Sequence, residues 1–76
     1  MAEATLSVSL KEEFNAEQCL DVSARIRSLK GVLRASFMPL GCFGIDTHRM
    51  LVTHDDREDV AAEIARMPEV AAVARL

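Results

Sequence analysis

The chain has 76 residues, of which 50% are apolar and only three are aromatic, so we expect a single domain over residues 1–76 with a thin core. The net charge of −3 argues against nucleic acid as the main partner. No apolar run approaches the roughly 18 residues of a membrane span, and the first residues lack the pattern of a secretory leader. Two cysteines are too few for a disulfide scaffold. We therefore expect a cytoplasmic domain with no membrane contact.

The first element is a strand over residues 5–10, where polar and apolar residues alternate without a break. The apolar members, Leu6, Val8 and Leu10, are expected to face the core. The hydroxyl residues between them then face away from it.

A helix follows, and both of its ends are marked in the sequence. Asn15 with Gln18 three residues later is typical of a capping box. Gly31 is a residue that can end a helix in a left-handed conformation. The residues between them form one apolar stripe at helical spacing: Cys19, Val22, Ile26 and Leu29.

Two further strands are expected in the middle of the chain. Residues 32–38 are apolar and end at Pro39, which indicates a second strand. Residues 39–44 carry turn residues, and a third strand occupies part of 45–54.

The last two elements are a helix and a short strand over residues 70–76. Asp55 or Asp56 is the expected cap of the helix, and Pro68 ends it. Its apolar stripe consists of Val60, Ile64 and Met67.

The two halves of the chain resemble each other at an offset of 38 residues. Residues 21–26 and 59–64 have the same amino acid at four of six positions. Each half reads as strand, helix and strand, and this order in so short a chain predicts an α+β, ferredoxin-like βαββαβ fold. Its four-stranded antiparallel sheet would carry both helices on one face. The other face would present Thr5, Ser7 and Ser9 on a central strand, and both sheet edges would be unpaired.

The first helix and its flanks resemble the heavy-metal-associated domain of copper chaperones and transport ATPases. Gly31-Val32 corresponds to that family's Gly-Val, with Val22, Ile26 and Leu29 at its apolar positions. The family's two metal cysteines then correspond to Asn15 and Gln18, so the resemblance implies the fold and not the family's copper ligands.

Two families that bind proteins are also similar to this chain. Subtilase propeptides share a Leu-Lys in the first strand, a central Gly-Val and a closing Pro-x-Val-x-x-Val, which correspond to Leu10-Lys11, Gly31-Val32 and residues 68–73. The small chaperones of periplasmic nitrate reductase maturation share the Gly-Val and an apolar third strand. Both resemblances imply binding to a protein partner.

The cysteines are the first candidates for chemistry. Cys19 and Cys42 are expected at the same end of the sheet, where Met38 and His48 could join them as soft-metal ligands. The other interpretation is that Cys19 is a core residue and Cys42 a loop thiol, and a disulfide between them is a third.

The charged side chains have two interpretations. His48 and His54 could sense pH, or they are structural, with His54 at the entry to the second helix. Five basic residues could form an anion-binding patch, or they complement the helix dipole on a solvated face. These residues are Arg25, Arg27, Lys30, Arg34 and Arg49.

The function expected from these observations is protein binding without enzymatic activity. The fold of acylphosphatases is the same, but their loop arginine is missing from residues 11–15, and no catalytic set can be assembled. We expect a self-associating module, or a small regulator, inhibitor or chaperone with a different partner, and no cofactor. The expected contact residues lie in the second and last strands: Val32, Leu33, Phe37, Val73 and Leu76. The alternative is a small-ligand or soft-metal site that uses Cys19 and Cys42.

Overall fold

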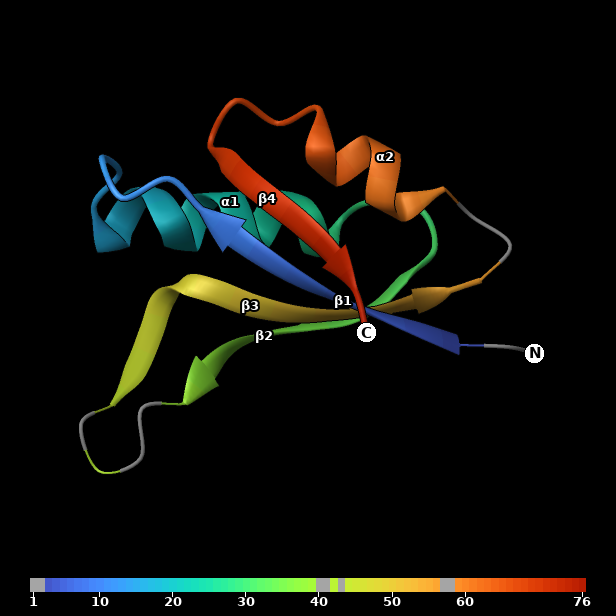
Figure 1. Ribbon diagram of the computed structural model, residues 1–76, viewed down its shortest axis with the longest axis horizontal. Helices are drawn as coiled ribbons and strands as arrows, with labels where there is room; N and C mark the ends of the chain where they lie inside the picture. Colours follow the sequence, from blue (N-terminus) through green and yellow to red (C-terminus); the bar gives the residue numbers. More distant parts are fainter. Residues whose placement is uncertain (1–2, 40–41, 43, 57–58) are drawn as a thin grey trace.

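The computed structural model describes residues 3–39, 42, 44–56 and 59–76 of the chain. The six elements follow one another as β1 (Glu3–Leu10), α1 (Ala16–Arg27), β2 (Val32–Pro39), β3 (Ile45–Asp55), α2 (Val60–Ala65) and β4 (Val70–Arg75) (Figure 1). The strands form one antiparallel sheet in the order β2-β3-β1-β4. This is the ferredoxin-like α+β fold that the sequence predicts, with β2 and β4 as its two edges.

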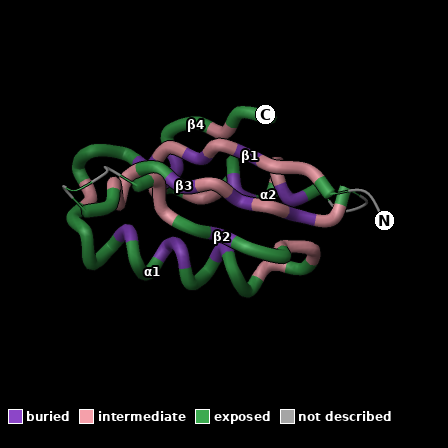
Figure 2. The backbone as a smooth tube through the Cα atoms, turned by 90° about the horizontal axis from the view of Figure 1, so that it is seen from below, coloured by how far each residue is buried: buried purple, intermediate pink, exposed green. Residues whose placement is uncertain are grey.

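The core lies on one face of the sheet because the apolar residues of the central strands alternate with polar ones. Leu6 and Val8 of β1 face Val52 and Met50 of β3 in register, and all four are fully buried. Buried side chains of both helices belong to the same core cluster, so both helices cover this face. In Figure 2, the buried segments of α1 lie on the turns that face the sheet. The hydroxyl residues of β1 lie on the other face, as predicted.

Helix α1 begins where the sequence predicts and ends earlier. Asn15 accepts a hydrogen bond from the Gln18 backbone N–H at 2.8 Å, and the Gln18 side chain accepts one from the Asn15 backbone N–H at 2.9 Å, which completes the capping box. The C-cap is Ser28 rather than a residue beside Gly31. Gly31 has a φ of 93°, which glycine adopts at little cost, and it turns the chain into β2. Leu29 therefore packs against the core from the connection.

The start of α2 differs from the prediction. Asp59 is the N-cap and accepts a hydrogen bond from Ala62 N–H at 3.3 Å, whereas Asp55 and Asp56 do not cap it. The reason is that β3 continues to Asp55, which pairs with Glu3. The helix has only six residues, so its stability depends on packing rather than on propensity.

The repeat between the two halves of the chain corresponds to equivalent core positions. Val22 and Ile26 of α1 and their counterparts Val60 and Ile64 of α2 are all buried. Each pair presents one apolar stripe to the sheet, although α1 is twice as long as α2. The predicted turn at residues 39–44 lies partly outside the described residues, since 40, 41 and 43 are not described.

Candidate functional site

The five predicted contact residues lie on opposite edges of the sheet. Val32, Leu33 and Phe37 belong to β2, and Val73 and Leu76 lie in or just after β4, with β3 and β1 between these edges. Leu33 is 49% exposed and Leu76 is 76% exposed, whereas the other three pack against the core. The structure therefore separates them into two surfaces and leaves one large apolar side chain exposed on each.

The β2 edge is partly covered by a side chain of α1. The Arg27 guanidinium donates two hydrogen bonds to the Ala35 carbonyl oxygen, from Nε at 3.2 Å and from Nη2 at 3.0 Å. Hydrogen bonds from a charged donor are stronger than neutral ones. Register shifts on both sides of this position further interrupt the ladder between β2 and β3. Both the Arg27 contact and the irregular register would hinder the pairing of an additional strand with the β2 edge.

The β4 edge is not covered by a hydrogen-bonded side chain among the described residues, and its one register shift, between Ser9 and Leu10 of β1, lies at the start of β4, away from Val73 and Arg75. The Leu76 N–H donates to the Thr5 carbonyl oxygen at 3.1 Å, and Ala74 pairs with Ser7. Hydrogen-bonded and non-hydrogen-bonded pairs alternate in an antiparallel ladder, so the backbone groups of Val73 and Arg75 point away from β1. Among the described residues, no side chain is hydrogen-bonded to these groups. Within the described part of the chain, the outer side of β4 thus presents unpaired backbone donors and acceptors.

A groove of about 610 Å³ runs from the β2 edge onto the open face of the sheet. Two arginines, Arg27 and Arg34, and two leucines, Leu33 and Leu51, line it. The rest of the lining is small or carries hydroxyl groups: Thr5, Val32, Ala35, Ser36 and Thr53. No carboxylate belongs to this lining among the described residues, although the chain has a net charge of −3.

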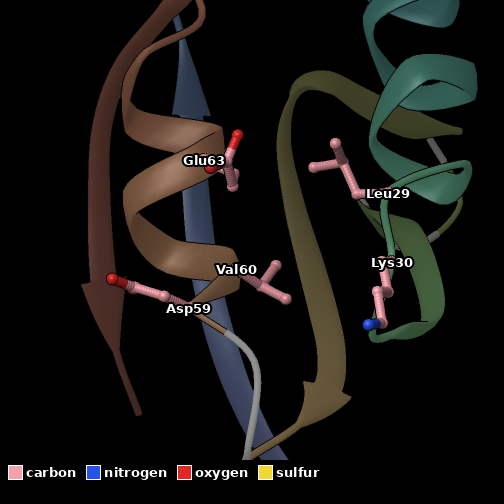
Figure 3. Close-up of a pocket in the computed structure, with 5 residues that line it drawn as sticks. All are labelled: Leu29, Lys30, Asp59, Val60 and Glu63. Carbon is pink, nitrogen blue, oxygen red and sulfur yellow. The ribbon is translucent and has the colours of Figure 1, made fainter.

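A second groove, of about 360 Å³, separates α2 from the connection that follows α1. Figure 3 shows Leu29 and Val60 pointing toward one another across it, with Glu63 beside them on α2. Asp59 points to the other side of α2. Lys30 lies at the end of the groove on the α1 side. The described lining of the groove thus combines two apolar residues, Leu29 and Val60, with three charged ones, Lys30, Asp59 and Glu63.

The structure places the two cysteines in different environments. Cys19 is fully buried in the core, and Cys42 is exposed in the connection between β2 and β3. Burial raises the pKa of the Cys19 thiol, against the opposing effect of a hydrogen bond from Thr47, and a raised pKa disfavours the thiolate that binds metals. Both cysteines are free thiols. The described part of the chain contains no group of three His, Cys, Asp or Glu residues able to hold a metal ion.

Both histidines make hydrogen bonds to the backbone. His48 Nε2 lies 2.6 Å from the Phe14 carbonyl oxygen and donates to it, which ties β3 to the segment before α1. His54 Nδ1 donates to the Asp55 carbonyl oxygen at 3.0 Å. The prediction that His54 enters the second helix is wrong, because it is a buried residue within β3.

The predicted basic residues do not form one patch. Arg25 forms ion pairs with Asp21 and with Glu69, whereas Arg27 turns to β2. Arg34 lines the groove at β2, and Arg49 lines a separate hollow together with Lys11. The groove at β2 could not be predicted from the sequence, because it depends on which residues of β1, β2 and β3 are neighbours across the sheet.

Comparison with known proteins found no matching family model, no matching curated protein and no matching solved structure. None of the helices in the described residues is long and apolar enough to span a bilayer.

Proposed function

We propose that this protein is a non-enzymatic protein–protein interaction module in which two copies pair through their β4 strands. The observation that carries the proposal is the difference between the two sheet edges. Arg27 covers part of the β2 edge, whereas β4 presents the unpaired backbone groups of Val73 and Arg75. An uncovered edge strand is a template for pairing with another chain.

The composition of β4 supports pairing with an identical strand. Three of its six residues are alanine, and it contains neither lysine nor proline, the residues that commonly protect edge strands. Small side chains allow a second strand to approach without steric conflict. Leu76, which follows β4, is 76% exposed, and an added strand would cover part of its apolar surface.

The directions of the backbone groups define a register for the pair. If Val73 exchanges hydrogen bonds with Arg75 of a second antiparallel copy, the two-fold axis passes beside Ala74. The two Ala74 residues then face each other as a non-hydrogen-bonded pair, with Cα atoms roughly 4.5 Å apart. Such a two-fold contact is closed, because each copy uses the same surface.

The arrangement of reactive side chains supports a role without catalysis. Cys19 is buried. His48 Nε2 and His54 Nδ1 each donate a hydrogen bond to a backbone carbonyl oxygen. A nucleophile beside a general base, which covalent catalysis requires, is thus not assembled from these three residues.

Charge changes at Ala74 test the proposed register. Sedimentation velocity over a concentration series is expected to show a dimer for the wild type and monomers for Ala74→Lys and for Ala74→Glu, because like charges would face each other across the axis. An equimolar mixture of the two variants should restore the dimer. Ala74 is exposed, so the variants should keep the fold, which circular dichroism checks.

Ser36→Lys is the matched control, because it adds the same charge to an exposed position of the opposite edge strand. It should leave the dimer unchanged. Hydrogen exchange adds a second measurement: the amides of Val73 and Arg75 should become protected as the concentration of the wild type rises. A wild type that stays monomeric up to about 1 mM, the weak end of specific affinities, contradicts the proposal, as does an Ala74→Lys variant that still dimerises.

A further inference from the structure

We infer that the groove at the β2 edge is a binding site for an acidic peptide segment that carries an apolar side chain. This site is independent of the proposed contact at β4, because β3 and β1 separate the two edges. Its ligand is a segment of a partner protein rather than a second copy of this chain.

The charge of the groove is the first argument. Arg27 and Arg34 both line it, and no carboxylate joins them there among the described residues. Within the described part of the chain, the Arg34 side chain forms no hydrogen bond or ion pair. In a protein of net charge −3, two arginines without a carboxylate beside them form a local positive field that attracts acidic groups.

The hydrogen bonds of Arg27 are the second argument. A guanidinium carries five N–H donors, and Arg27 uses two of them on the Ala35 carbonyl oxygen, so three remain. Because this contact already orders the side chain, a ligand carboxylate would meet a pre-organised donor and less conformational entropy would be lost on binding. Arg34 adds a second guanidinium on the same groove.

The apolar part of the lining is the third argument. Leu33 is 49% exposed. Leu51 lies on β3 at the open face, directly between Ser7 of β1 and Ser36 of β2, its partners in register. Contact with an apolar ligand side chain would remove part of both leucines from water, worth roughly 25 cal/mol per Å² buried. The groove thus combines charged and apolar contacts, which fit a peptide better than a phosphate backbone.

Fluorescence anisotropy with short labelled peptides tests the inference. A peptide in which Glu alternates with Leu is expected to bind and to bind more weakly as the salt concentration rises. A matched peptide with Lys in place of Glu should not bind, and one with Ser in place of Leu should bind more weakly. A labelled single-stranded oligonucleotide is the competing probe.

Two pairs of variants locate the site. Arg34→Glu should weaken binding of the Glu-Leu peptide at least tenfold, as expected for the loss of a charge-assisted hydrogen bond. Arg66→Glu makes the same charge change on α2, at an exposed arginine paired with Glu63, and should change affinity less than twofold. Leu33→Ser should weaken binding, whereas Leu20→Ser, at a similarly exposed leucine, should not.

Several results would overturn the inference. These are equal binding of the Glu and Lys peptides, equal effects of Arg34→Glu and Arg66→Glu, a preference for the oligonucleotide, or no binding at about 1 mM protein. If Arg34→Glu dissociates a wild-type dimer that Ala74→Lys leaves intact, the groove binds a second copy, and both proposals are wrong. If the wild type does not bind the Glu-Leu peptide but Ala74→Lys still dissociates its dimer, only the peptide site is refuted.

Discussion

Arg25 in α1 forms an ion pair with Glu69, the residue immediately before β4 and 44 positions later in the chain. The Glu69 carbonyl oxygen also accepts a hydrogen bond from the Lys11 N–H at 2.9 Å. Glu69 therefore links the end of β1, the first helix and the start of the last strand. The hydrogen bond from the Arg25 guanidinium is the main reason why the pKa of the Glu69 carboxyl group lies below its ordinary value.

The ion pair predicts a pH-dependent contribution to stability. A lowered pKa in the folded state means that the stabilisation is present above the unfolded pKa, about 4.3 for Glu, and is lost as the pH falls through the folded value. Glu69→Gln should therefore lower the free energy of unfolding at pH 7 and have less effect at pH 3. Urea unfolding at both values measures the difference.

Glu63→Gln is the control for this experiment. Glu63 pairs with Arg66 three residues later, and both side chains are more than half exposed, so their pair should contribute little. An effect of Glu69→Gln that is the same at pH 7 and pH 3 would show that the carboxylate charge is not what stabilises the contact.

The capping box predicts a measurable cost at the start of α1. Asn15→Ala removes the acceptor of the Gln18 N–H and should lower the free energy of unfolding by about 1 kcal/mol. Asn15→Asp keeps an acceptor at the same place and should cost much less. Chemical denaturation of both variants measures this, and equal losses would contradict a capping role.

The two helices should contribute similarly to the core despite their different lengths. Ile26 and Ile64 are both fully buried, so Ile26→Val and Ile64→Val should each cost roughly 0.5–1.5 kcal/mol. Leu20→Val, at a side chain that is 52% exposed, should cost less than either. If Ile64→Val has no effect on unfolding in urea, α2 does not belong to the cooperative core.

The cysteines should differ strongly in reactivity. Cys42 is exposed and Cys19 is buried with a raised pKa, so a thiol reagent at pH 7 should modify Cys42 quickly and Cys19 only after unfolding. Cys42→Ser should remove the fast phase. A fast phase that persists in Cys42→Ser would mean that the Cys19 thiol is accessible in the folded protein.

A soft-metal site that uses both thiols would require Cys19 to leave the core. We therefore expect zinc, copper or cobalt to leave the melting temperature unchanged. A rise in the melting temperature that disappears in both Cys19→Ser and Cys42→Ser would support the metal site instead. Cys19→Ser changes a core residue and can lower the melting temperature by itself. The melting temperature of each variant is therefore compared with and without the metal.

The order of the elements could be predicted from the sequence because their apolar residues have the periods of strands and helices. Leu6 and Val8 alternate with hydroxyl residues, and Val22 and Ile26 are spaced by one helical turn. The capping box at Asn15 is equally local, since both of its hydrogen bonds span three residues.

Boundaries that depend on distant pairing could not be predicted in this way. Asp55 has the residue type of a helix cap, but it pairs with Glu3 in the sheet and donates its N–H to the Gly31 carbonyl oxygen at 2.7 Å. The cap of α2 therefore moves to Asp59. Contacts between residues far apart in the chain outweighed the local preference.

The thin core implied by 76 residues and three aromatics was determined by the sequence alone, because composition limits how much apolar surface the chain can bury. The tertiary structure decided which surfaces stay available. It placed Leu33 and Leu76 on opposite edges, turned Arg27 to the carbonyl oxygen of Ala35, and left the backbone of β4 uncovered. The physical reason is that strand order and register bring together residues that are far apart in the chain. The local sequence around each residue does not indicate which of these contacts will form.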